Sequence, residues 1–256
     1  MRAAALVAHG DGTCTRESHH RFSPLRLTGG RGARVDSEVP LYQLSIPEVY
    51  NTWNWTTNYP DWHELQAYFD HCDKVLELSK DSAFKTVVTG AEFDTNEGKW
   101  NVTTQDGRHA KAKYLIVCAG FAAKRYIPDY PGIENFKGVL HHSSFWPNEG
   151  VNTNGKKVAI IGTGASGVQM IQELAPTVEK LTVFQRTPNL AIPMGKRDLT
   201  EGEQNQLKPY YKDIFTLREK CFAGFHYDFC ERNTSDDTPE ENEALYEELW
   251  KRGGFA

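Results

Sequence analysis

Gly162, Gly164 and Gly167 have the spacing G-x-G-x-x-G, which can hold a phosphate group against the backbone. The apolar run 158–161 before them predicts a strand buried on both faces. Residues 165–175 predict a helix that Pro176 closes, and residues 181–184 predict a second buried strand. Strand, glycine turn, helix and strand within about 30 residues are the setting that a dinucleotide site requires.

Each glycine of this motif has its own physical role. Gly162 allows a tight turn after the strand, Gly164 lets the backbone approach a pyrophosphate, and Gly167 lets the helix pack close to the strand. The N-terminus of the helix offers unpaired N–H groups to the phosphates. The alternative is a glycine-rich turn that binds no ligand. The candidate residues of the turn are Gly162, Thr163, Gly164, Ala165, Ser166 and Gly167.

The end of the second predicted strand indicates which dinucleotide would bind. Arg186 lies there, whereas a site for NAD or FAD usually has Asp or Glu to accept hydrogen bonds from the ribose. A guanidinium matches the charge and shape of a 2′-phosphate, which a carboxylate would repel. We therefore expect NADP. The alternative for Arg186 is a solvated charge at a strand end.

Composition excludes several classes of protein. The chain has 256 residues, of which 39% are hydrophobic and 25% charged, and its net charge of −5 does not suggest a nucleic-acid surface. No apolar run approaches the length of a membrane span. Five scattered cysteines without C-x-x-C indicate neither a disulfide framework nor a zinc site, and His19-His20 lacks further ligands. We expect no metal and a reducing, cytoplasmic setting.

Further elements follow from periodicity and turn residues. Residues 61–79 predict a helix capped by Asp61, and the tryptophans and tyrosines of 53–62 are expected to pack over a core more than to line a flat ligand. Helices are also expected after Thr200 and Thr238. Strand-like runs separated by Gly98 and Gly107 predict a β-meander, and the last run ends in an apolar stretch typical of a buried parallel strand. The runs are 85–93, 99–104 and 109–118, and the apolar stretch is 114–120.

A second motif carries a family resemblance. Residues 136–147 have the spacing F-x-G-x-x-x-H-x-x-x-W-P, which resembles the fingerprint of Baeyer–Villiger monooxygenases, a group of flavin-containing monooxygenases. These flavoproteins use FAD, NADPH and O₂ to insert oxygen beside a ketone. The fingerprint precedes a G-x-G-x-x-G, as it does in that family. Its residues here are Phe136, Gly138, His142, Trp146 and Pro147.

The resemblance covers about residues 29–256 and implies roles for particular side chains. Arg34 and Asp36 lie in a segment that resembles the loop facing the flavin, and Asp36, beside flavin and nicotinamide, is the candidate catalytic residue. Tyr42 and Val88 would touch FAD. Thr187 would join Arg186 and the glycine turn in holding NADP. His142 and Trp146 would tie two domains together without taking part in the chemistry.

The same resemblance implies an α/β architecture. We expect a partial FAD-binding domain with a β-meander at 29–135, and a Rossmann-like NADP-binding domain with a helical insertion and a helical C-terminal segment at 136–256. Residues 1–28 would be a poorly ordered or unrelated arm. Family members are about twice as long, open with an FAD-binding glycine motif that 1–28 matches only weakly, and have a catalytic arginine with no counterpart here. The chain therefore resembles the middle of such an enzyme.

Two functions remain open at this point. The first is an FAD- and NADPH-dependent monooxygenase that inserts oxygen into a ketone of a small organic substrate, with a natural product as one option. The second is a truncated, non-catalytic homologue that binds NADP. By family resemblance the first is the better description. Physical reasoning from the chain alone favours the second, because the strand at 114–118 would lack neighbours. Its apolar edge could then pair with another chain.

Overall fold

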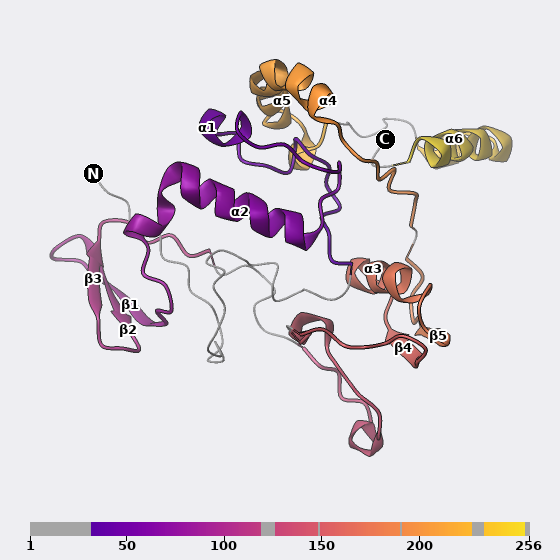
Figure 1. Cartoon of the computed structure of the whole chain (residues 1–256), viewed down its shortest axis with the longest axis horizontal. Coiled ribbons are helices and arrows are strands. Elements are labelled where there is room, and N and C mark those ends of the chain that lie inside the picture. Colours follow the sequence, from indigo (N-terminus) through magenta and orange to yellow (C-terminus); the bar gives the residue numbers. More distant parts are fainter. Residues whose placement is uncertain (1–31, 119–125, 148, 190, 227–232, 254–256) are drawn as a thin grey trace. The chain divides into compact units, whose positions relative to one another are not determined.

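The computed structural model of the chain describes residues 32–118, 126–147, 149–189, 191–226 and 233–253 (Figure 1). They divide into two compact units. The described residues of Leu78–Leu140 belong to the first, called here the meander unit, and those of Phe22–Glu77 and His141–Ala256 belong to the second, called the larger unit. The arm expected at 1–28 lies outside the described residues. The domain boundaries expected from the sequence stay a prediction.

Three antiparallel strands form the meander unit's sheet, in the order β1, β2, β3. The turns between them contain Gly98 and Gly107, with φ of 61° and 81°, a backbone conformation that favours glycine. Asp94 accepts hydrogen bonds from the backbone N–H groups of Asn96 and Glu97 and so closes the first turn. The β-meander is confirmed. Its strands are β1 (Val88–Asp94), β2 (Lys99–Thr104) and β3 (His109–Ala112).

The buried parallel strand expected at 114–118 is wrong for this structure. The third meander strand ends at Ala112, and no named strand covers 114–118. Tyr114, Ile116 and Val117 are 59%, 52% and 64% exposed. A parallel strand is buried only where other strands and helices cover it. An apolar run indicates only that burial would be favourable. No described strand pairs with this segment along its length.

The glycine motif has the expected strand–helix–strand context. β4 (Lys157–Ile161) pairs in parallel with β5 (Lys180–Phe184), and α3 (Ala165–Leu174) connects them. The expected burial of both strands is wrong. Ile160 is 7% exposed, but Ile161 and Phe184 are 62% and 55% exposed, because the described part of this sheet has two strands only.

The core of the larger unit forms around α2 (Trp62–Leu76). Asp61 caps this helix by accepting from the Glu64 backbone N–H at 3.0 Å, as expected. Trp55 and Tyr59 are each 2% exposed, which confirms the expected core packing for these two, whereas Trp62 lines an open cleft. The buried cluster consists of Val35, Val39, Val49, Trp55, Leu65, Tyr68 and Cys72.

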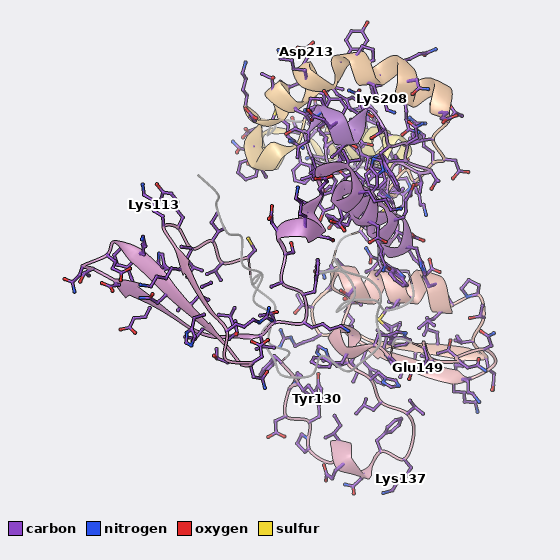
Figure 2. All side chains as sticks on the ribbon, turned by 60° about the vertical axis from the view of Figure 1, so that its left-hand side comes forward. Lys113, Tyr130, Lys137, Glu149, Lys208 and Asp213 are labelled. Atoms are coloured by element: carbon purple, nitrogen blue, oxygen red, sulfur yellow. The ribbon has the colours of Figure 1, made fainter. Side chains whose placement is uncertain are left out.

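The remaining helices also belong to the larger unit. Thr200 and Thr238 make the expected capping boxes, and Gly253 ends the last helix. The single helix expected after Thr200 is interrupted by a 3-10 turn at Lys208–Tyr210, where Pro209 cannot donate a helical hydrogen bond. Lys208 (Figure 2) donates to Asn54 Oδ1 at 2.7 Å. The helices are α1 (Pro47–Tyr50), α4 (Glu201–Leu207), α5 (Tyr211–Arg218) and α6 (Pro239–Arg252).

The structure also contains short 3-10 turns. Across the described ranges, no helix has the length and apolar character needed to cross a membrane. The other 3-10 turns are Leu78–Asp81, Ile133–Asn135, Ser143–Phe145, Phe222–Gly224 and Thr234–Asp236.

Leu65 gives a direct test of this core. The Leu65→Ala variant should lower the free energy of unfolding by roughly 2–5 kcal/mol, because Leu65 is 1% exposed and its removal leaves a cavity. The matched control is Leu217→Ala, at a position 49% exposed, which should cost less than about 1 kcal/mol. Urea denaturation followed by tryptophan fluorescence measures both. Equal losses in the two variants would contradict the assignment of the core.

Candidate functional site

The glycine turn has the geometry that its spacing predicts. Gly162 has φ of 102°, and its N–H donates to the Phe184 carbonyl at 2.8 Å, which joins the turn to β5. A Cβ on Gly167 would lie 2.4 Å from the Gly162 carbonyl oxygen, closer than real Cβ atoms come. A Cβ on Gly164 would meet no heavy atom within 4 Å. Gly167 therefore serves close packing, whereas Gly164 faces open space that a ligand can enter.

The start of α3 is available to an anion. Gly164 is the N-cap, and no side chain there accepts a hydrogen bond from the first turn. Ala165 and Ser166 are exposed. The first N–H groups of a helix have no partner within the helix and carry the positive end of its dipole. This end of α3 can therefore bind phosphate oxygens through its backbone.

The segment after β5 is attached to the same turn. Gln185 donates from Nε2 to Thr163 Oγ1 at 3.0 Å, and Asn189 donates from Nδ2 to the Thr163 carbonyl at 2.7 Å. Arg186 and Thr187 lie between these two attachments and are exposed. Among the described residues, no carboxylate pairs with Arg186. The Arg186 guanidinium, on a segment that is hydrogen-bonded to the glycine turn, is thus available to a negatively charged ligand.

Arg34 connects the loop before α2 to α3. Its backbone N–H donates to Gln169 Oε1 at 3.4 Å, and its carbonyl accepts from Gln169 Nε2 at 3.1 Å. Its guanidinium contacts Gln172 Oε1 and pairs with Glu173 at 3.9 Å. The side chain is 12% exposed. The loop therefore rests on the helix that starts at the glycine turn.

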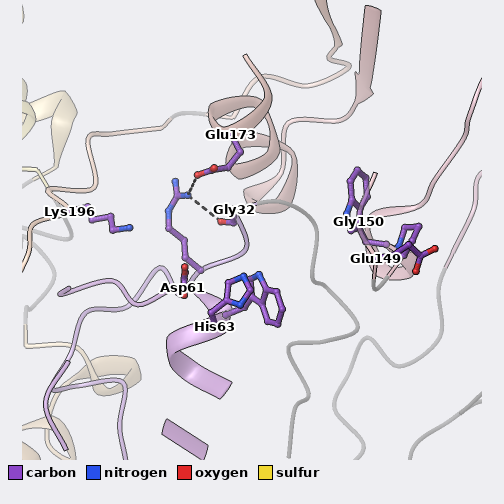
Figure 3. Close-up of a pocket in the computed structure, with 11 residues that line it drawn as sticks. Gly32, Asp61, His63, Glu149, Gly150, Glu173 and Lys196 are labelled. Carbon is purple, nitrogen blue, oxygen red and sulfur yellow. Dashed lines mark hydrogen bonds and ion pairs between the residues drawn. The ribbon is translucent and has the colours of Figure 1, made fainter. Parts of the chain in front are cut away.

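An open cleft of about 360 Å³ lies beside Arg34 (Figure 3). Trp62 and His63 stack with ring centroids 3.6 Å apart at the start of α2. Trp146 and Pro147 of the fingerprint line the cleft as well. Both charge signs are represented, by Arg34 and Lys196 and by Asp61, Glu149 and Glu173. Aromatic faces with charges of both signs suit a polar, partly flat molecule.

The flavin-facing residues expected from the resemblance belong to both units. Asp36 and Tyr42 are exposed in the larger unit, while Val88 lies at an irregularity of register in the meander unit. Arg218 Nη1 donates to the carbonyls of Leu41 and Gln43 at 2.7 and 3.2 Å and so fixes the backbone on either side of Tyr42.

Tyr59 and Glu64, which lie near these loops, have shifted pKa values. Burial raises the pKa of Tyr59, and the negative charges of Glu38 and Asp36 raise it further. Burial also raises the pKa of Glu64, while the hydrogen bond from the Thr56 backbone N–H opposes that shift. Both shifts have burial as their largest cause, so Tyr59 stays a neutral hydroxyl beside the loop that carries Asp36.

The fingerprint is divided between the two units. Phe136 and Gly138 belong to the meander unit, and Phe136 is 61% exposed. His142, Trp146 and Pro147 belong to the larger unit, where all three are partly buried. The His142 carbonyl accepts from the Phe145 N–H at 2.8 Å and closes a 3-10 turn. The assigned roles of these residues stay predictions.

Sequence reasoning missed several residues that shape the site. Gln169 and Glu173 contact Arg34 across more than 130 positions of sequence, and Gln185 and Asn189 hold the segment that carries Arg186. Polar residues on a predicted helix normally indicate a solvated face. The one local signal was the run of Gln and Glu on an otherwise apolar α3.

The comparisons with known proteins define the class. The model of the flavin-binding monooxygenase-like family matches residues 45–194, more than half of the chain, and the chain belongs to this family. Its relatives include enzymes of the Baeyer–Villiger type, as expected from the fingerprint. FAD-binding monooxygenase acrE of Aspergillus aculeatus is 58% identical over 88% of this chain and 38% of its own length. Cyclopentanone 1,2-monooxygenase of a Comamonas species is 45% identical over 88% of this chain and 41% of its own.

The architecture agrees with a solved structure of the same class. Cyclohexanone monooxygenase from Rhodococcus sp. Phi1, bound to NADP⁺, superposes with a TM-score of 0.80 at 33% identity, over 89% of this chain and 43% of that one. The expected α/β class is confirmed. The cofactor pair expected from the sequence, FAD and NADP, is the pair that homologous proteins bind. The chain spans about 40% of the length of the curated relatives that it matches.

The two inner glycines of the turn should respond differently to the same change. Gly167→Ala should lower the free energy of unfolding by about 2–3 kcal/mol, because the methyl group meets a backbone oxygen that cannot move freely. Gly164→Ala should cost less than about 1 kcal/mol, since it changes the N-cap in open space. Thermal denaturation compares the two. A larger loss at Gly164 would show that the close packing of α3 has been misplaced.

Proposed function

We propose that this chain provides the NADPH-binding part of an FAD- and NADPH-dependent monooxygenase that inserts oxygen beside the carbonyl of a small ketone. The observation that carries the proposal is the open glycine turn at the α3 N-terminus, to which the segment with the exposed Arg186 is hydrogen-bonded on either side; among the described residues, no carboxylate pairs with Arg186. The relatives named above support the reaction class. One is described as FAD-binding, and another is named for its ketone.

The described residues fit a dinucleotide phosphate. Backbone N–H groups at the start of α3 would hold the pyrophosphate, with Gly164 leaving room for it. Arg186, with Thr187 beside it, would hold the 2′-phosphate, because a guanidinium can form two charge-assisted hydrogen bonds to it. The attachment of Gln185 to Thr163 supports this placement. It limits how far Arg186 can move from the glycine turn.

Bound FAD and O₂ would supply the oxygen chemistry: with two electrons from NADPH, one oxygen atom would enter the ketone and the other would leave as water. This chain's own residues would bind and orient. Asp36, the candidate catalytic residue, would contact the flavin and the nicotinamide, and Arg34 would hold its loop on α3. Tyr42 and Val88 would contact FAD. His142 and Trp146 would tie the domains together.

Absorption of the purified protein tests the proposal. Flavin bands near one equivalent per chain, with oxygen uptake that depends on NADPH and a cyclic ketone, are the expected result. A protein that binds NADPH but has no flavin absorbance would support the alternative, a non-catalytic NADP-binding homologue. The exposed segment 114–118 would then be a candidate for pairing with another chain. A cytoplasmic location stays part of the proposal.

Replacement of Arg186 tests the choice of cofactor. The parent should bind NADPH more tightly than NADH, and Arg186→Ala should weaken NADPH binding roughly 10–100-fold, because charge-assisted hydrogen bonds to the phosphate are lost. Binding of NADH should change by less than about threefold. Nucleotide fluorescence titration measures both, with Arg252→Ala on α6 as the control. Equal affinity of the parent for the two nucleotides would refute the preference.

Gly164→Ala tests the pyrophosphate position separately. Because its Cβ points into open space, the variant should fold normally and still bind NADPH at least about tenfold more weakly. The methyl group would occupy the room that the backbone leaves for the phosphates. Titration with NADPH, after circular dichroism has confirmed the fold, gives the answer. Unchanged affinity would move the pyrophosphate away from this turn.

A further inference from the structure

Gln169 holds the backbone of Arg34 through both ends of its side-chain amide. The amide oxygen accepts from the Arg34 N–H at 3.4 Å, and the amide nitrogen donates to the Arg34 carbonyl at 3.1 Å. Two residues on neighbouring β-strands exchange the same pair of N–H and C=O hydrogen bonds, but here the side-chain amide of Gln169 takes the place of one strand. The same loop pairs on its other side with the start of α2. Val35 donates to the Pro60 carbonyl at 3.2 Å, and Trp62 donates to the Ala33 carbonyl at 3.0 Å.

The side chain of Arg34 strengthens the contact. Its guanidinium contacts Gln172 and Glu173, which lie one turn further along α3 from Gln169 (Figure 3 shows the pair with Glu173). Gly32 permits this approach. It has φ of 82°, and a Cβ there would lie 2.0 Å from Glu173 Cγ. The loop thus contacts α3 through the backbone of Arg34, through the side chain of Arg34 and at Gly32.

We propose that Gln169 is a positioning residue that clamps the Arg34–Asp36 loop onto α3, so that the placement of Asp36 follows the placement of the helix that binds the dinucleotide. The proposal rests on the proposed function for its link to NADPH. The physical basis of this coupling is the short distance between Gly164 and Gln169 along α3. Gln169 lies five residues after Gly164, the N-cap of α3, so any restraint on the helix start is passed to the loop within about 1.5 turns.

Amide hydrogen exchange of the purified full chain tests the clamp without substrate. In ligand-free protein, Gln169→Ala should speed exchange of the Arg34 and Val35 amides about fivefold, because the loop loses its hydrogen bonds to α3. Gln206→Ala, which removes the same side chain at an exposed site on α4, should leave both amides within about twofold of the parent. Amides of β2 in the meander unit serve as the internal reference.

Saturating NADPH extends the same measurement. In the parent, NADPH should slow exchange of the Arg34 and Val35 amides at least about threefold, and in Gln169→Ala this slowing should disappear while NADPH still binds. Gln169→Glu keeps the acceptor for the Arg34 N–H and loses the donor. It should therefore retain most of the ligand-free protection, and it keeps the test open if Gln169→Ala folds poorly.

The outcomes separate the clamp from the proposed function. Equal protection of Arg34 and Val35 in the parent and in both Gln169 variants overturns the clamp, whether or not NADPH binds. NADPH binding that leaves these amides unchanged in the parent overturns the link between helix and loop. If the parent binds no NADPH, the proposed function fails and the link fails with it. In that case, faster exchange in ligand-free Gln169→Ala would still support the structural clamp.

Discussion

The close approach of α3 to the end of β4 is the constraint on which the site depends. The space beside Gly167 is limited by the Gly162 carbonyl oxygen, which would lie 2.4 Å from any added Cβ. This contact fixes where the helix begins, and with it the direction of the N–H groups of the first turn. The Gly162 N–H also donates a hydrogen bond to the Phe184 carbonyl, and this second contact positions the glycine turn relative to β5. Together, the contact between Gly167 and Gly162 and the hydrogen bond from Gly162 to Phe184 determine where the chain leaves β5 toward Arg186.

Features determined by neighbours in sequence could be predicted. The Asp61 cap, the capping boxes at Thr200 and Thr238 and the roles of Gly162 and Gly167 all depend on atoms a few residues apart. Short sequence motifs are therefore enough to predict these hydrogen bonds and steric limits. The parallel pair of strands around the glycine turn was predictable for the same reason, since its strand, helix and strand are consecutive.

Features determined by distant neighbours could not be predicted. An apolar strand such as 181–184 indicates that burial is favourable, but the side chains become buried only where other strands and helices lie against them. The exposure of Ile161 and Phe184 reflects the small sheet of which they are part. The contact between Arg34 and Gln169 spans 135 positions and joins residue types that usually face solvent. The Gln and Glu residues of α3 were a local signal of a polar face, but they did not identify Arg34 as the partner.

The placement of the loop on α3 also bears on the family resemblance. The sequence likeness assigns Arg34 and Asp36 to the flavin side and Gly164 to the NADP side, as though two sites were built on separate scaffolds. In the structure, Arg34 is hydrogen-bonded to Gln169 of α3, the helix that begins at the glycine turn, and both residues belong to the larger unit. A reaction in which NADPH must meet a flavin requires the two sites to keep a fixed relation. A loop that is hydrogen-bonded directly to α3 would supply part of that relation within this chain, because these hydrogen bonds hold Arg34 on the helix that begins at the glycine turn.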